Sequence, residues 1–361
     1  MFTRDETNKV KGIAICLLIF HHMYRTVQDI QIRGTMLHIL TGEQISKMAY
    51  CFRICVYIFA ILTAYGVTLC YIRWQEHGKS TLRFLLQRYL KLLAPFWFTL
   101  VLLYIVYAIA PGLQPFASYQ GNVKYLLGDF FAVLDLVGKA GNMFNGVFWY
   151  MNFAVVEIVL IPLIYFLARK FGYAILVFTS VFWGFIPRAF NSIYGGDYVW
   201  YIFAIEFGVL AACNNPFGRI KEWYEKCAKW KQVVLALALL LSAGAFPYMA
   251  WFKVQFDYFG ISAIFHTMGA VAVILFSYLV IKGKVISHVL MVLGKYSADM
   301  FLIHTIVFVK LDFIVCRSSN MIVQYLVCVV LCLLISFLIA ILKKYTGYNR
   351  LVERMAGYLG R

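Results

Sequence analysis

The chain is poor in charge, and above all in acidic charge. Only 14% of its 361 residues are charged, and 33 lysines and arginines stand against 16 aspartates and glutamates. A soluble globular chain carries about 25% charged and about 45–50% apolar residues, whereas 63% of this sequence is hydrophobic. The shortage of charge excludes an ordinary soluble domain and predicts an all-α, multi-pass membrane protein.

The sequence also lacks the marks of a metal site or a disulfide framework. Its nine cysteines are an odd number, most of them lie inside apolar runs, and no metal-type spacing joins them with histidine. We therefore expect small core residues and no metal. No internal repeat, low-complexity tract or interdomain linker stands out, so we predict a single membrane domain over residues 1–361.

The first apolar run has no small-residue cleavage site and is followed at once by the polar residues Arg25 and Asp29. We therefore expect this run to stay in the mature protein. The formal charge of +17 would suit nucleic acid, but the basic residues form short clusters at the ends of apolar runs. This pattern favours membrane lipids and an anionic ligand as partners, and we expect no nucleic acid.

About ten apolar runs are long enough to be membrane spans. They cover residues 12–27, 48–72, 92–110, 147–168, 172–187, 198–212, 232–251, 260–281, 296–316 and 321–342. Lysine and arginine outside the runs are concentrated in both terminal tails and in the loops after even-numbered runs. The positive-inside rule therefore predicts that both termini lie in the cytoplasm, which suits a protein of the cell membrane.

The first run carries two adjacent histidines, His21 and His22, where an ordinary span would carry only hydrocarbon. Ionisable groups at that depth are functional by default. His22 is eleven residues after Lys11, about 16 Å along a helix and three turns plus about 20° around it. Lys11 and His22 therefore share one face, with the lysine at the mouth and the imidazole near mid-membrane. Arg25 follows His22 by three residues.

A basic segment precedes the third run and contains Arg83, Arg88 and Lys91. Arg88 and Lys91 are three residues apart and so are neighbours on a helix. Cations at a cytoplasmic span end can meet a phosphorylated ligand. Ordinary positive-inside charge is an equal alternative on spacing alone.

Four further ionisable residues fall inside the predicted spans: Arg53, Glu157, Glu206 and His266. Each glutamate is near mid-membrane and has two alternative roles. It could pair with a histidine or with Arg53, or it could form a hydrogen bond between helices. Arg53 lies close enough to the outer end to reach the headgroups. His266 lies in the outer half of its span, on the side where an acceptor would arrive.

The ninth run contains Ser297 and His304, and His304 is about 13 Å from the cytoplasmic end. This depth is close to that of His22. One hypothesis is that the two histidines share a site, and the other is that His304 is a buried histidine whose hydrogen bonds are satisfied. The longest connection, Pro111 to Gly146, is predicted to lie outside. Its apolar middle, Val123 to Val137, suits either an interfacial anchor or a lid.

Five segments together resemble the acyltransferase family 3 of integral membrane proteins. They have the family's order and spacing: Lys11-Gly12 with His22, Phe59 to Gly66, Arg88 to Lys91 with Pro95, Trp149 to Pro162, and Leu293 to His304. The sequence departs from the family pattern at Ala64, Lys91 and Phe301. It also has Asn8 where many members carry aspartate, and Ala154 and Val155 where one branch carries glutamates.

The resemblance implies acyl transfer from acyl-CoA, for which we expect acetyl-CoA, to a hydroxyl of a surface or exported glycan or a lipid-linked sugar. It implies no permanently bound cofactor, an essential His22, and basic residues at the CoA side, here Lys11, Arg83, Arg88 and Lys91. His21, Arg25, Glu157, Glu206, Ser297 and His304 are candidates for support, and Arg53, Trp149 and His266 for the acceptor side.

His22 would act as a general base on the acceptor hydroxyl, or would itself take the acyl group as an acyl-imidazole. The competing function is a transporter or flippase for an anionic or lipid-linked sugar, which would equally need basic mouths and buried ionisable groups. Against it, the sequence shows no paired Gly/Pro-interrupted spans in corresponding halves. A purely structural partner would leave the buried histidines and glutamates without a purpose.

Overall fold

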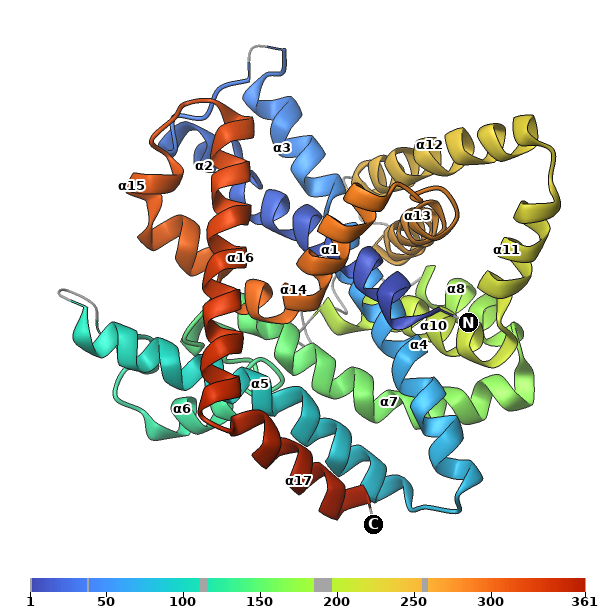
Figure 1. The fold of residues 1–361 in the computed structure, drawn as a ribbon, viewed down its shortest axis with the longest axis horizontal. Coiled ribbons are helices and arrows are strands. Elements are labelled where there is room, and N and C mark those ends of the chain that lie inside the picture. The colour runs from blue at the N-terminus through green and yellow to red at the C-terminus, as the bar shows by residue number, and fades with distance from the viewer. Residues whose placement is uncertain are drawn as a thin grey trace.

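The computed structural model describes residues 2–37, 39–110, 114, 116–184, 197–254 and 259–360. This part of the chain forms a bundle of helices (Figure 1) and contains no strand, only the isolated bridges Met36–Asn320 and Leu37–Leu40. The predicted all-α class is confirmed for these residues.

The helices follow the apolar runs closely. Those at the start of the chain are α1 (Arg4–Met23), α2 (Val27–Ile32), α3 (Gly42–Cys51), α4 (Ile54–Glu76), α5 (Thr81–Ile109), α6 (Val123–Phe130) and α7 (Trp149–Phe171). The later ones are α8 (Ala174–Gly184), α10 (Ile202–Asn214), α11 (Pro216–Lys226), α12 (Lys229–Val254), α13 (Phe259–Leu279), α14 (Lys284–Lys310), α15 (Asp312–Val315), α16 (Met321–Tyr345) and α17 (Tyr348–Gly360).

Seven helical stretches of the described residues are long and apolar enough to cross a membrane. They are Gly42–Glu76, Thr81–Ile109, Gly146–Phe171, Lys229–Phe252, Ile261–Leu279, Lys284–Lys310 and Met321–Tyr345. The chain is therefore a multi-pass membrane protein, while the total of about ten spans and the side of the termini stay predictions. The stretch Tyr198–Asn214 is apolar but shorter, and the first half of α1 is rich in charged residues.

Several helix ends differ from the predicted span boundaries. The first run ends at Met23 rather than residue 27, because the Thr26 side chain accepts from the Asp29 backbone N–H and so caps α2. The run 48–72 is two helices, α3 and α4, with a break at Phe52 and Arg53. The ninth span belongs to a helix that begins at Lys284, twelve residues earlier than predicted. The predicted end of the fifth span, residue 187, lies outside the described residues.

Helix α1 runs through the interior of the bundle (Figure 1), and its closest neighbour is α14. Two glycines allow the contact. A Cβ atom on Gly12 would lie 2.0 Å from the Leu290 carbonyl oxygen, and one on Gly294 would lie 1.8 Å from that of Asn8. No side chain fits at such distances, so the two backbones touch directly. This packing fixes the register between the helices that carry His22 and His304.

Candidate active site

The rings of His22 and His304 lie side by side, with their centres 5.0 Å apart and their planes inclined by 53°. One comes from α1 and the other from α14, which the glycine contacts hold together. The similar depths read from the sequence thus correspond to neighbouring positions in space. The pair gives the bundle interior two groups that can each accept or donate a proton.

Hydrogen bonds define the proton positions of the two flanking histidines. The Nδ1 atom of His304 is 2.7 Å from the Phe301 carbonyl oxygen, and that of His21 is 2.7 Å from the Ala49 carbonyl oxygen. A carbonyl only accepts, so Nδ1 carries the proton in both rings and Nε2 is left with a lone pair. The Nε2 atom of His304 is buried and has no hydrogen-bond partner among the described residues.

The ring of His22 differs from its neighbours. It is only half-buried, and no described residue makes a hydrogen bond to it. His21, in contrast, is 8% exposed and is tied to α3 through Ala49. Of the two adjacent histidines, His22 is therefore the one whose nitrogens are open to a reactant.

A cavity of about 250 Å³ lies where α1, α4, α5, α7 and α14 meet. Its polar lining includes the side chains of Lys11, Thr63, Lys91 and Ser297, and Ser297 also donates to the Gly294 carbonyl oxygen at 2.8 Å. The remainder is apolar or aromatic. Two cations from separate helices thus face one cavity, which is suitable for an anionic group attached to an apolar arm.

One wall of the cavity borders the histidine pair. Phe301 belongs to its lining, and the Phe301 ring centre is 5.9 Å from that of His304. Tyr150 of α7 also lines the cavity and lies 5.1 Å from Phe301. Sequence reasoning missed Tyr150, although it directly follows Trp149. Aromatic side chains therefore separate the lysines from the imidazoles.

The other basic residues of α5 lie beside this cavity rather than in its lining. The guanidinium of Arg88 lies 5.2 Å over the Phe84 ring, and its Nε atom is buried without a partner in the described part of the chain. Arg83 is exposed. Of the four cations expected on the donor side, the structure brings Lys11 and Lys91 to one cavity and leaves Arg88 a donor without an acceptor.

Comparison with known protein families adds to this geometry. Residues 8–341 match the model of acyltransferase family 3, described as an acyltransferase domain. The chain belongs to acyltransferase family 3. No curated protein and no solved structure matches it. The resemblance read from the five segments is confirmed, and the chain is a membrane acyltransferase.

Three residues expected on the acceptor side of this acyltransferase meet around Tyr201. Arg53 donates to the Tyr201 hydroxyl at 3.4 Å, and the ring of Trp149 lies 6.0 Å from that of Tyr201. His266 stacks on Tyr57 at 5.1 Å, and Tyr57 lies 4.7 Å from Tyr201. The two tyrosines were missed from the sequence. Tyr57 follows Arg53 by one helical turn, which is the spacing that could have indicated it.

The two buried glutamates lie away from the histidines. Glu157 is fully buried beside the backbone of Ala64, and Glu206 accepts a hydrogen bond from Thr179 at 2.8 Å. Neither forms an ion pair with a histidine or arginine of the described residues. The helix-to-helix role is the one that fits Glu206, whose partner is on α8. The same residues offer no group of three His, Cys, Asp or Glu side chains that could hold a metal ion.

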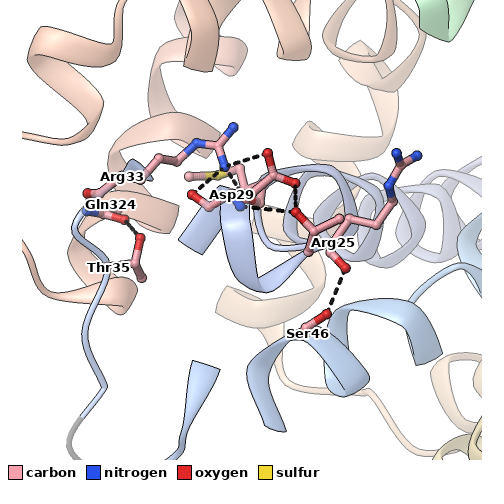
Figure 2. A network of polar contacts seen from close by, with 8 residues as sticks. Arg25, Asp29, Arg33, Thr35, Ser46 and Gln324 are labelled. Carbon is pink, nitrogen blue, oxygen red and sulfur yellow. Dashed lines mark hydrogen bonds and ion pairs between the residues drawn. The ribbon is translucent and has the colours of Figure 1, made fainter. Parts of the chain in front are cut away.

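Arg25 lies at the far end of α1 from Lys11. Its carbonyl oxygen accepts from the Ser46 hydroxyl at 2.8 Å, while the Asp29 carboxylate pairs with Arg33 at 3.6 Å. Figure 2 shows the Arg25 guanidinium turned away from Asp29 and Arg33. The side chain is exposed, one turn beyond His22, and is not engaged by that network.

The long connection between α5 and α7 packs onto the bundle. The Asn145 side chain donates to the Thr305 hydroxyl at 2.7 Å, one residue from His304. Trp97 stacks on Phe130 at 5.0 Å and donates to its carbonyl oxygen at 2.7 Å. The hydroxyl of Tyr89, the residue next to Arg88, also donates to the Phe131 carbonyl oxygen at 2.9 Å. The connection therefore packs against α5 at the level of the donor residues as well as beside Thr305, and its role as an anchor or a lid stays a prediction.

A buried carboxyl group organises the connection between α5 and α7. Asp129 accepts from the Tyr119 hydroxyl at 2.8 Å and from the Phe144 backbone N–H at 2.8 Å. Burial raises the pKa of Asp129 above its usual value, and the hydrogen bonds from Phe144 and Tyr119 partly oppose this effect. The charge of Asp129 therefore affects the hydrogen bonds that hold Tyr119 and Phe144 together.

Proposed function

We propose that the protein is an acyl-CoA-dependent O-acyltransferase of the cell membrane. It moves an acyl group, expected to be acetyl, from cytoplasmic acyl-CoA to a hydroxyl of a surface or exported glycan or a lipid-linked sugar. The observation that carries the proposal is the neighbouring pair His22 and His304 beyond a cavity that has Lys11 and Lys91 in its lining.

The cavity suits the donor. Coenzyme A joins a polyanionic nucleotide to a long, thin arm that ends in the thioester. Lys11 and Lys91 are the groups for its phosphates, and the unpartnered Nε–H of Arg88 is a donor that a phosphate oxygen would satisfy. The distance from Lys11 to His22 is about 16 Å along the helix, a length that the arm covers.

In the proposed reaction, His22 accepts and then returns one proton. The imidazole takes the proton of the acceptor hydroxyl as its oxygen attacks the thioester carbonyl carbon. The carbon–sulfur bond then breaks, the thiolate of CoA leaves, and the imidazolium returns the proton to that sulfur. His304, whose Nδ1–H is engaged by Phe301, offers its Nε2 lone pair to orient the His22 ring or the incoming hydroxyl.

The opposite side of the histidine pair suits the acceptor. The group around Tyr201, with Arg53, Trp149 and His266, combines aromatic faces with polar tips, as sugar binding requires. The exposed Arg25 adds a cation near the outer end of α1. Ser297 belongs to the donor side, and Glu206 links α10 to α8 through Thr179.

The experiment uses isolated membranes that contain the protein and acetyl-CoA labelled either in the acetyl group or in the adenine. Transfer of the acetyl label alone to a glycan or lipid-linked sugar is the expected result. Movement of a sugar across the membrane without any label would instead support the transporter reading and refute the proposal.

A further inference from the structure

The last helix, α17, is amphipathic and lies beyond the residues that match the family model, which end at 341. The turn before it contains Gly347 with φ +70°, a conformation that favours glycine. This turn directs the chain back so that α17 lies along α5 (Figure 1), and α17 is the principal packing partner of α5.

Polar contacts fasten α17 at both ends and in its middle. The Tyr348 hydroxyl donates to the Ala94 carbonyl oxygen at 2.8 Å. The Gln87 side-chain amide donates to the Ala356 carbonyl oxygen at 2.8 Å. At the far end the Lys79 ammonium donates to the Gly360 carbonyl oxygen, where a cation also complements the negative end of the helix dipole.

Apolar packing fills the space between these hydrogen bonds. Leu90 and Ala94 of α5 are buried against Ala356 of α17. Val352 and Leu359 of α17 are partly buried against the same cluster. The contact covers one face of α5 from Gln87 to Ala94. Helix α4 packs on the preceding turn, where Phe84 contacts Tyr71 and Trp74. The Tyr89 hydroxyl adds one further contact, a hydrogen bond to the Phe131 carbonyl oxygen at 2.9 Å.

The opposite face of the same stretch belongs to the donor side. At about 100° per residue, Arg88, Leu92 and Pro95 point away from the face that contains Leu90 and Ala94. Leu92 and Pro95 line the cavity, as does Lys91 at the edge between the faces. The stretch is therefore held between α17 and the proposed CoA site.

Pro95 weakens α5 at the end of this stretch, so the stretch depends on packing for its direction. A proline inside a helix removes the hydrogen bond to the carbonyl four residues earlier, here Lys91, and tends to kink the helix there. The half of α5 beyond Pro95 is anchored separately, through Thr99, which donates to Asp299 at 3.1 Å. The half that carries Arg88 and Lys91 thus takes its direction from what packs on its outer face.

We infer that α17 is a positioning element for the donor: it fixes the direction of α5 before Pro95 and so holds Arg88 and Lys91 at the cavity. The inference rests on the proposed acyl-CoA site. Tyr348, Gln87 and Ala356 are its positioning residues, and none of them lines the cavity.

The test measures the dissociation constant of acetyl-CoA for the full-length protein in lipid nanodiscs by titration calorimetry. Ala356→Glu places a charge in the interface between α17 and α5. Gly357→Glu is the matched control, because nothing lies within 4 Å of the Cβ that it would gain. We expect Ala356→Glu to weaken binding about tenfold, the equivalent of one hydrogen bond to a charged group, and Gly357→Glu to change it less than twofold.

Tyr348→Phe removes a single hydroxyl. It is a milder second variant that tests the inference even if Ala356→Glu fails to fold. We expect a smaller loss of affinity in the same direction, with an unchanged thermal midpoint. In an Arg88→Gln/Lys91→Gln background, Ala356→Glu should cause no further loss, because the groups that α17 positions are gone.

Equal affinity in Ala356→Glu and Gly357→Glu would overturn the inference, as would an undiminished loss in the Arg88→Gln/Lys91→Gln background. These outcomes leave acetyl-CoA binding by the unaltered protein intact. Failure of the proposed function looks different, because the unaltered protein would then not bind acetyl-CoA at all.

Discussion

His22 and His304 face one another across the contact of α1 and α14, with ring centres 5.0 Å apart. They are far apart in sequence, and what joins them is the absence of side chains at Gly12 and Gly294. The geometry of the histidine pair therefore depends on two backbone contacts that lie well away from the imidazoles.

The first prediction concerns these glycines. Gly12→Ala and Gly294→Ala would each add a Cβ about 2 Å from a carbonyl oxygen, so the helices must separate. We expect a loss of about 1–3 kcal/mol in stability, typical of overpacking, together with reduced acyl transfer. Thermal unfolding in detergent measures the first. Gly66→Ala is the control, because its Cβ would meet nothing within 4 Å. If Gly294→Ala were as stable and active as Gly66→Ala, the close contact would not matter.

The donor side gives the second prediction. Lys11→Gln and Lys91→Gln should each weaken acetyl-CoA binding about tenfold, since each removes a charged hydrogen-bond donor. Lys91→Arg should retain or improve binding, because its fork suits phosphate. Arg83→Gln is the control, as Arg83 is exposed and does not line the cavity. Calorimetric titration measures the affinities, and unchanged binding in Lys11→Gln and Lys91→Gln would mean that the two lysines serve only packing or topology.

The third prediction is a pH dependence of the connection between α5 and α7. Burial raises the pKa of Asp129 in the folded protein, so the folded state holds the proton more tightly than the unfolded state. The stabilising contribution is then complete below the ordinary value of about 3.9 and is lost as the pH rises through the raised pKa. Hydrogen exchange around Phe144, corrected for the intrinsic effect of pH, should report this loss. Asp129→Asn should remove the dependence, and its persistence in that variant would assign it to another group.

Membrane topology gives the fourth prediction. The lysine and arginine distribution puts both termini and Ser80 in the cytoplasm and Ser118 outside. In a cysteine-free background, an impermeant thiol reagent applied to intact cells should label Ser118→Cys but not Ser80→Cys. Labelling of Ser80→Cys would reverse the orientation.

Periodicity and hydropathy were sufficient for most helices, because apolar runs of span length have few alternatives in a membrane. They did not reveal the break at Phe52 and Arg53 or the early start of α14 at Lys284, since neither helix start has a side-chain cap that the sequence could have shown. Depth along a helix suggested that His22 and His304 are level. Contact between them depended on Gly12 and Gly294, whose close approach is a property of the helix pair and is not contained in either segment alone.

The cavity and the connection between α5 and α7 show the same limit of prediction from sequence. Lys11 and Lys91 were expected on one side of the membrane, but their convergence with Ser297 required three helices to be placed in space. Tyr201 and Asn145 lie in segments that offered no spacing signal. Helix α17 carried no expectation at all, because an amphipathic tail outside the apolar runs is compatible with many positions.

The most direct test of the account compares His22→Ala with His21→Ala in the labelled acetyl-CoA assay on isolated membranes. His21 is tied to Ala49, whereas His22 is free of hydrogen bonds to the described residues and lies beside His304. His22→Ala should lower acyl transfer by about 10²- to 10⁴-fold, the usual cost of losing a general base, with acetyl-CoA still bound and protein still in the membrane. His21→Ala should retain substantial activity. An inactive His21→Ala beside an active His22→Ala would contradict the assignment of His22 as the base.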